Sequence, residues 1–179
     1  HTKARIESID GANIHAALDA GKVVIVAGFQ GIDELGNITT LGRGGSDYTA
    51  AIMAAGANAS RLDIWTDVSG MMTADPRWVP NARPIPDISY KEAMELSHFG
   101  AKVIYPPTIQ PVMSRNIPVW VKNTFAPSDN GTLIQNESPA PGQTISGISS
   151  INKIALLSLE GSGMIGIPGF SKRLFEALA

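Results

Sequence analysis

The hydrophobic positions of the N-terminal third predict a helix followed by a strand. Ile14, Ala17 and Leu18 have the spacing of one helical face, and Gly21 stands where the end of that helix is expected. Residues 22–27 then form a short, β-branched and continuously apolar run, which predicts a strand buried on both faces. The same alternation continues along the chain, so the pattern favours a fold in which helices and strands take turns.

The middle of the chain supplies most of the expected elements. The expected elements are an exposed turn at 33–37, a helix at 48–55 after Ser46, a strand at 61–66, a helix at 90–99, a helix after Pro106–Pro107 and a strand at 118–122. Ser89 and Glu92 have the spacing of a capping box at the start of the fourth of these. This order of elements predicts a layered α/β fold with a largely parallel sheet.

A change in residue composition near the C-terminal end predicts a second structural unit. Residues 136–144 are rich in proline, serine and glycine and are expected to be a linker. Beyond them, 153–160 predicts a strand, and a helix is expected to present Phe170, Leu174, Phe175 and Leu178 on one face. A lone strand and helix bury too little surface to fold alone, so this unit is expected to be cut short or completed by another chain.

Composition narrows the class of protein. The chain has 179 residues, 44% hydrophobic and 17% charged, with a net charge of −2 and a pI near 5.9. These values give no reason to expect a nucleic acid or an anionic membrane as partner. No run is long enough to span a membrane, and the first ten residues lack a signal-peptide core. Cysteine is absent, which excludes disulfides and fits a cytoplasmic protein.

The strongest chemical motif is the glycine-rich loop at residues 42–47, between an expected strand and an expected helix. Glycines let backbone amides approach an anion, and a helix N-terminus adds free N–H groups and partial positive charge. Arg43 is able to hold a carboxylate or phosphate through two hydrogen bonds, while Asp47 is able to orient a lysine or help hold a metal. A tight turn capped by Ser46 is the simpler alternative. The loop matches neither a Walker A motif nor a dinucleotide fingerprint.

Two further clusters follow predicted strands or helices. Thr66, Asp67 and the later 75–77 segment come after the strand at 61–66, where ligands of α/β sheets bind. Lys102 follows the predicted helix at 90–99. An Asx turn at Asp67 and an ordinary exposed lysine are the simpler alternatives. If Arg43, Arg77 and Lys102 converge, they supply the cations that a phosphoryl transferase needs. The histidines (His1, His15 and His98) are too scattered to predict a metal cluster.

Four motifs resemble those of the aspartate kinases, which have the amino-acid kinase fold, and they occur in the same order as in that family: residues 40–51, 63–68, 75–77 and 99–103. Four further segments resemble in sequence the kinase half of bifunctional aspartokinase–homoserine dehydrogenases: 95–100, 117–118, 122–124 and 147–149. The resemblance implies a three-layer αβα fold, with residues 1–135 as the C-terminal, nucleotide-binding part of the catalytic domain. It further implies a linker at 136–144 and the beginning of an α+β ACT regulatory domain at 145–179.

The resemblance also implies the reaction. ATP, with Mg²⁺, phosphorylates the β-carboxylate of L-aspartate to give 4-aspartyl phosphate, at the start of lysine, threonine and methionine biosynthesis. The implied roles are substrate binding by Arg43, Gly44, Gly45 and Ser46, catalysis by Ser46, Asp47 and Lys102, and nucleotide binding by Thr66, Asp67, Met72, Arg77 and Lys102.

The chain departs from the family pattern at several points. Many members carry tyrosine where this chain has Met72, and a histidine is common where it has Tyr105. The family's N-terminal Lys-Phe-Gly-Gly-Thr motif and its acidic contact to the substrate amino group are not in the 179 residues. The isolated chain is therefore expected to be inactive, as a fragment of a longer enzyme.

A GxGxxG pattern occurs at residues 161–166, after an expected strand. A nicotinamide site would need an acidic residue about 20 positions later, beyond the end of the chain. The resemblance implies instead a regulatory loop for threonine or lysine, formed by Gly161, Ser162, Gly163, Met164 and Gly166, in a homo-oligomer. Two alternatives stay open: an amino-acid kinase acting on glutamate, acetylglutamate or UMP, and a non-catalytic regulatory or dimerisation module.

Overall fold

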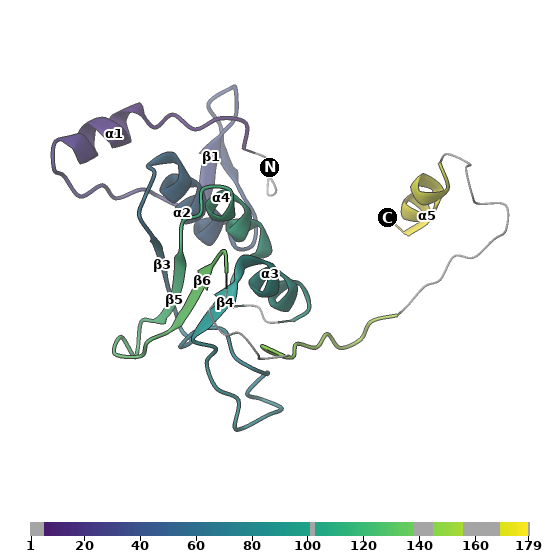
Figure 1. The fold of residues 1–179 in the computed structure, drawn as a ribbon. Coiled ribbons are helices and arrows are strands. Elements are labelled where there is room, and N and C mark those ends of the chain that lie inside the picture. Colours follow the sequence, from purple (N-terminus) through teal and green to yellow (C-terminus); the bar gives the residue numbers. More distant parts are fainter. Residues whose placement is uncertain (1–5, 101–102, 138–144, 156–168, 179) are drawn as a thin grey trace.

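A four-stranded mixed sheet forms the centre of the molecule (Figure 1). The computed structural model describes residues 6–100, 103–137, 145–155 and 169–178. In spatial order the strands are β3 (Leu62–Thr66), β5 (Val119–Asn123), β6 (Thr132–Gln135) and β4 (Asp87–Ser89). β3 pairs parallel with β5, and β4 parallel with β6, whereas β5 and β6 are antiparallel. The expected largely parallel sheet is therefore mixed, because the short connection at 124–131 returns β6 antiparallel to β5.

One face of this sheet is covered by helices. The covering elements are α2 (Gly45–Gly56), α3 (Tyr90–His98), the short 3₁₀ helix η1 (Pro106–Thr108) and α4 (Ile109–Met113). Side chains alternate along the strands, so Leu62 and Ile64 of β3 are buried in the same core as Ala51 of α2 and Val112 of α4. These contacts place the core between the sheet and a single helical layer.

The opposite face of the sheet is more open. Trp65 is 49% exposed, and the Nζ atom of Lys122 lies 5.5 Å from the Trp65 ring centroid and 5.9 Å from that of Trp120. The described helices that pack on the sheet all lie on the other face. The described part of the chain thus has two layers, rather than the expected three.

The ends of the helices show how local sequence determines their start. The capping box is confirmed: the Ser89 hydroxyl accepts a hydrogen bond from the Glu92 N–H at 3.2 Å, and the Glu92 carboxylate accepts from the Ser89 N–H at 2.9 Å. The simpler alternative, in which Ser46 caps the turn, is wrong. α2 begins at Gly45 and its N-cap is Gly44, whose φ of +72° favours glycine, so Ser46 lies inside the first turn.

The expected strand at 22–27 is also wrong. A helix, α1 (Ala12–Asp19), precedes it as predicted, and Gly21 has the positive φ of +71° that a helix end uses. The run itself is not a strand, and Val23 and Ile25 are 94% and 95% exposed. A strand requires a hydrogen-bonded neighbour, and no described strand pairs with this run.

A β-hairpin links this run to the glycine-rich loop. Its antiparallel strands are β1 (Gln30–Ile32) and β2 (Ile38–Thr40). The predicted turn at 33–37 is confirmed, since the Asp33 carboxylate accepts a hydrogen bond from the Asn37 N–H at 2.8 Å. Hydrogen bonds from the backbone N–H and the side-chain amide of Asn37 lower the pKa of the Asp33 carboxyl group. The hairpin delivers the chain to the start of the loop at residue 42.

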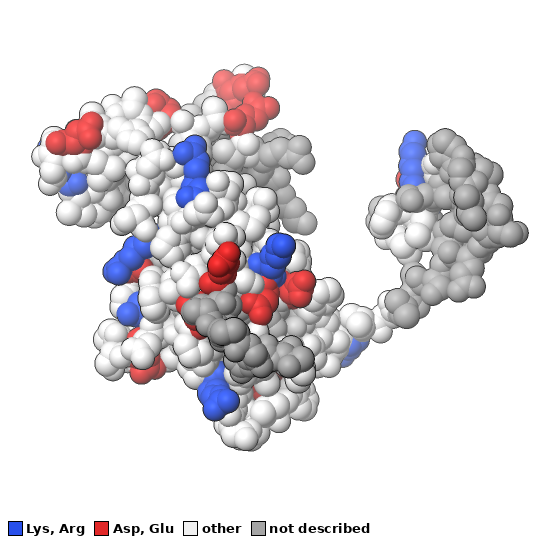
Figure 2. Space-filling model, in the orientation of Figure 1, with Lys and Arg blue, Asp and Glu red and all other residues white. Residues whose placement is uncertain are grey.

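The C-terminal helix is confirmed as α5 (Phe170–Leu178). The expected linker and strand lie largely outside the described residues, and 153–155 are not in a strand. The proposed regulatory loop at 161–166 lies entirely outside them. Among the described helices, none is long and apolar enough to span a bilayer. On the face drawn in Figure 2, basic and acidic side chains are interspersed.

Candidate functional site

The glycine-rich loop is shaped by backbone conformations that glycine adopts readily. Gly42 and Gly44 have φ values of +82° and +72°. Gly45 is buried, and a side chain there would come within 2.9 Å of Leu41 and Phe29. The loop therefore turns tightly onto the N-terminus of the twelve-residue helix α2, where N–H groups lack partners within the helix. Such a loop is well suited to hold an anion.

Tyr105 packs directly on this loop. A side chain at Gly44 would overlap the Tyr105 ring, and the Tyr105 N–H donates a hydrogen bond to the Asp47 carboxylate. Burial raises the pKa of Asp47, and the hydrogen bond from Tyr105 opposes that shift. Tyr105 stands where a histidine is common in the aspartate kinases, and no role was predicted for it. The structure assigns it a contact with both the backbone and a candidate catalytic carboxylate of the loop.

The polar side chains of the loop differ in exposure. Arg43 and Ser46 are exposed, whereas Asp47 is half-buried. An exposed guanidinium beside free helix N–H groups is able to grip a carboxylate in bidentate fashion. The loop thus combines groups that are suited to an anion with a carboxyl group whose pKa is raised by burial.

A cavity of about 620 Å³ lies beyond the carboxyl end of β3. Val68, Met72, Asp75, Arg77 and Val103 contribute to its lining. Apolar residues and a few charged groups are typical of small-molecule sites, and the volume is in the usual range for them. Two of the predicted nucleotide contacts, Met72 and Arg77, therefore line one cavity.

Arg77 is held at the cavity by Asp75. Its Nη2 atom lies 2.6 Å from Asp75 Oδ2, and its Nε lies 3.0 Å from Asp75 Oδ1. These hydrogen bonds lower the pKa of Asp75 and raise that of Arg77. The Arg77 side chain is nevertheless 82% exposed, so its remaining donors are open to a phosphate.

Thr66 and Asp67 are not among the lining residues of this cavity. Thr66 ends β3, Asp67 follows it directly before Val68, and the Thr66 hydroxyl donates to Asp67 Oδ1 at 3.2 Å. The neighbouring strand end is close, because the Thr124 N–H donates to the Thr66 carbonyl at 2.8 Å. The expectation that this cluster lies at the carboxyl edge of the sheet is confirmed.

The segment 103–105 connects the cavity to the glycine-rich loop. Val103 lines the cavity, and Tyr105, two residues later, packs on Gly44. The glycine-rich loop and the cavity thus both lie next to one three-residue segment of the chain. Lys102 immediately precedes this segment and lies outside the described residues.

Residues 148–152 complete the lining of the cavity. They were expected to belong to the C-terminal unit, and no local pattern connects them with the motifs at 66–77. For metals, the described residues hold no group of three or more potential ligands. A Mg²⁺ ion bound through phosphates needs one or two carboxylates; Asp75 is paired with Arg77, and Asp47 lies in the first turn of α2 beside the glycine-rich loop.

Comparison with known proteins gives the family. The family model described as "Amino acid kinase family" matches residues 1–123. The bifunctional aspartokinase/homoserine dehydrogenase of Haemophilus influenzae is 47% identical over 171 residues, which are 96% of this chain and 20% of that protein.

Two solved structures of E. coli aspartokinase III are similar. The R-state complex with aspartate and ADP has a TM-score of 0.65 and 46% identity, over 70% of this chain and 28% of that one. The T-state complex with lysine and aspartate has a TM-score of 0.63 and 46% identity, over 73% of this chain and 29% of that one. This chain therefore spans less than a third of either protein. The chain belongs to the amino acid kinase family, and it is similar in sequence to aspartokinases of that family.

Proposed function

We propose that the chain is the nucleotide-binding part of an aspartokinase, which transfers the γ-phosphate of ATP to the β-carboxylate of L-aspartate. The observation that carries this proposal is the connection of two half-sites by residues 103–105: a cavity lined by Met72 and Arg77, and an anion-binding loop at 42–47. The similarity to an aspartokinase solved with aspartate and ADP supports both ligands. The product, 4-aspartyl phosphate, enters lysine, threonine and methionine biosynthesis.

The half-sites divide the two substrates between them. Met72 packs against the base through its thioether, Thr66 and Asp67 bind the nucleoside, and Arg77 with Lys102 holds the phosphates. Arg43 and the amides of Gly44, Gly45 and Ser46 bind the aspartate. Catalysis then consists of holding the acceptor carboxylate in line with the γ-phosphate while cations offset the charge.

Asp47 and Mg²⁺ organise the transfer in this proposal. The half-buried Asp47 carboxylate lies at the loop, where it orients the phosphate-binding Lys102 or a metal. Asp47 and Asp75 are the carboxylates that would help to hold Mg²⁺ bound together with ATP, and the ion would supply positive charge to offset that of the phosphates.

The surrounding biology follows from the same proposal. The complete protein is a cytoplasmic homo-oligomer. Its C-terminal ACT domain, of which residues 145–179 are the first part, binds an amino-acid effector. The similar E. coli protein solved with lysine supports lysine, and threonine is the second candidate. Bulky substitutions at Gly163 or Gly166 should relieve inhibition by the effector while leaving uninhibited turnover largely intact. Unchanged inhibition curves would remove this loop from the proposal.

The deciding experiment measures acceptor choice in the complete aspartokinase. Trapping of the acyl phosphate with hydroxylamine should give product with aspartate and ATP, and none with glutamate, acetylglutamate or UMP as acceptor. In parallel, the 179-residue chain should bind a fluorescent ADP analogue that ATP displaces. Turnover with another acceptor, or no binding of ADP, overturns the proposal.

A further inference from the structure

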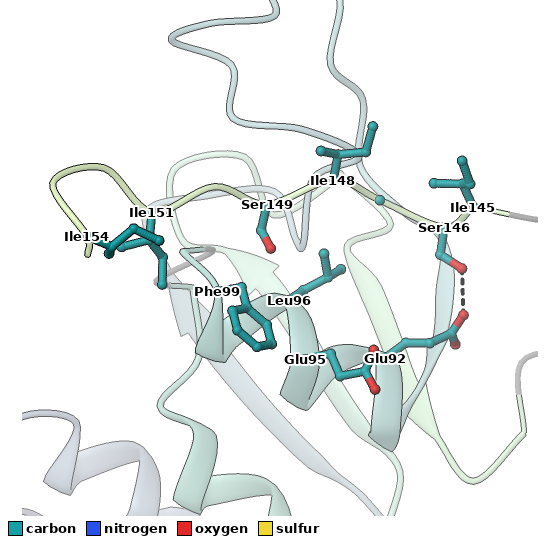
Figure 3. Close-up of a pocket in the computed structure, with 11 residues that line it drawn as sticks. Glu92, Glu95, Leu96, Phe99, Ile145, Ser146, Ile148, Ser149, Ile151 and Ile154 are labelled. Carbon is teal, nitrogen blue, oxygen red and sulfur yellow. Dashed lines mark hydrogen bonds between the residues drawn. The ribbon is translucent and has the colours of Figure 1, made fainter. Parts of the chain in front are cut away.

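Residues 145–152, here named the crossing segment, run across α3 as they leave the body of the molecule (Figure 3). Two hydrogen bonds hold them there. The Ser146 hydroxyl donates to Glu92 Oε1 at 2.6 Å, and the Ile148 N–H donates to the Thr73 carbonyl at 2.9 Å. The first bond attaches the segment to the N-terminal turn of α3, and the second attaches it to the loop that carries Met72.

Two glycines, Gly147 and Gly100, allow the same segment to pack closely against the body at two further points. A Cβ atom at Gly147 would lie 3.3 Å from both Ile85 and Leu96, which belong to the core. Gly100, whose φ is +128°, lies so close to the Ser150 carbonyl that a side chain would overlap it. Four attachments between residues 146 and 150 thus fix the crossing segment on the body.

That position makes the segment a wall between two cavities. Residues 148–152 line the cavity that contains Met72 and Arg77. A second hollow of about 560 Å³ lies on the side of α3 and is lined by Phe99, Ile151 and Ile154 (Figure 3). Ile151 lines both cavities, whereas Ile154 lines only the second. The two isoleucines are three positions apart, so substitutions at 151 and at 154 distinguish the effect of the nucleotide cavity from that of the second hollow.

We propose that the crossing segment forms one wall of the nucleotide site and that Ile151 contributes directly to nucleotide affinity. This inference rests on the proposed function. Ile151 is 44% exposed and Ile148 is 66% exposed, so apolar surface remains that a planar base would cover. Ser149, Ser150 and Asn152 add hydroxyl and amide groups to the same wall, which are able to bond to a base or ribose.

A consequence of this arrangement is linkage between the nucleotide and the segment. A ligand that touches the docked segment stabilises docking, and docking increases affinity by the same factor. One wall of the nucleotide site thus belongs to the part of the chain that precedes α5 in the sequence.

The test compares Ile151→Ser with Ile154→Ser in the 179-residue chain, using a fluorescent ADP analogue. We expect Ile151→Ser to weaken binding about five- to tenfold, because it removes apolar contact with the base. Ile154→Ser should change binding less than about twofold. Urea denaturation without nucleotide checks that both variants are folded. Equal affinities of the two variants would overturn the inference while leaving the proposed function intact, whereas a wild-type chain that binds no ADP overturns both.

A second measurement does not depend on an apolar substitution. The chain has no cysteine, so Asn152→Cys and Ile154→Cys each introduce a single reactive thiol. ADP should slow the alkylation of the cysteine at position 152, which lines the nucleotide cavity, and leave the one at 154 unaffected. Equal rates at 152 with and without ADP contradict the placement of the segment at the nucleotide.

Discussion

At the scale of single residues, the contact between Gly44 and Tyr105 shows how this site depends on the absence of a side chain. Gly44 has a left-handed conformation, and the Tyr105 ring occupies the space that a Cβ would need. Any other residue at position 44 must displace the ring or change the loop. The glycine-rich loop is therefore held in place from outside as well as by its own turns.

The stability effects of two glycines of the same helix should have opposite signs. Gly44→Ala should lower the free energy of unfolding by about 1–3 kcal/mol, because it combines backbone strain with a clash. Gly56→Ala should raise it by about 0.5–1 kcal/mol, since Gly56 lies within α2 and a Cβ there meets nothing within 4 Å. Urea denaturation of the 179-residue chain measures both, and a neutral Gly44→Ala would contradict the packing described here.

In the complete aspartokinase, substitutions of the three candidate basic residues should affect the use of different substrates. Arg77→Ala and Lys102→Ala should weaken the use of ATP more than that of aspartate, because both are proposed to hold phosphates. Arg43→Ala should raise the KM for aspartate more than that for ATP. One lost charge contact in a transition state typically costs about 100- to 1,000-fold in rate. Steady-state kinetics with each substrate varied in turn decide the assignment, which fails if Arg77→Ala and Lys102→Ala raise the KM of aspartate alone.

At the scale of elements, α3 has a position that two separate parts of the chain determine. Its capping box begins the helix, and the same Glu92 carboxylate accepts a hydrogen bond from Ser146 of the crossing segment. The hydrogen bonds from Ser146 and Ser89 lower the pKa of Glu92 below its usual 4.5. One ionised carboxylate therefore stabilises both a helix start and the docking of a later segment.

The contribution of Glu92 should depend on pH. Its pKa is lower in the folded state, so its charge stabilises the fold above pH 4.5 and loses that effect as the pH falls through the folded-state pKa. Glu92→Gln should cost about 1 kcal/mol at pH 7, and this difference should disappear in acid. Glu95→Gln, on an exposed position of the same helix, is the matched control and should change stability by less than about 0.5 kcal/mol. A constant difference between pH 7 and pH 3 would contradict the role of the charge.

At the scale of the whole molecule, the described chain leaves apolar surface uncovered. Val23 and Ile25 are almost fully exposed, and one face of the sheet carries partly exposed tryptophans. Exposed apolar patches mark surfaces that bind other protein. The chain spans 20% of its bifunctional relative, which leaves ample sequence in that relative to cover such a surface.

The isolated 179-residue chain should have no useful aspartokinase activity. The family's N-terminal phosphate-binding lysine motif is not among its residues, and the loss of one strong charge contact typically costs about 100- to 1,000-fold. A coupled assay of ADP release, with the complete aspartokinase as positive control, measures this. Turnover close to that of the complete enzyme would show that the motif is dispensable.

Several elements were predictable because their causes are local. The Ser89 and Glu92 capping box, the turn at 33–37, the helix after Pro106–Pro107 and the strand that became β3 each follow from a few adjacent residues. β4 and β6 were missed, since strands of three and four residues give too little periodicity to recognise. The motifs at 42–47 and 66–77 were found because glycine and charge patterns mark them without reference to the fold.

The amino-acid sequence by itself determined the family, the start of α3 and the chemical groups of the site, because these depend on residue type and short spacing. Only the tertiary structure decided which groups meet. The packing of Tyr105 on Gly44, and the wall that 148–152 add to the cavity of Met72 and Arg77, both join residues that are far apart in the chain. The exposed run at 22–27 gives the same lesson, since its pattern was that of a buried strand. Pairing and burial depend on a partner in space, which a local pattern does not contain.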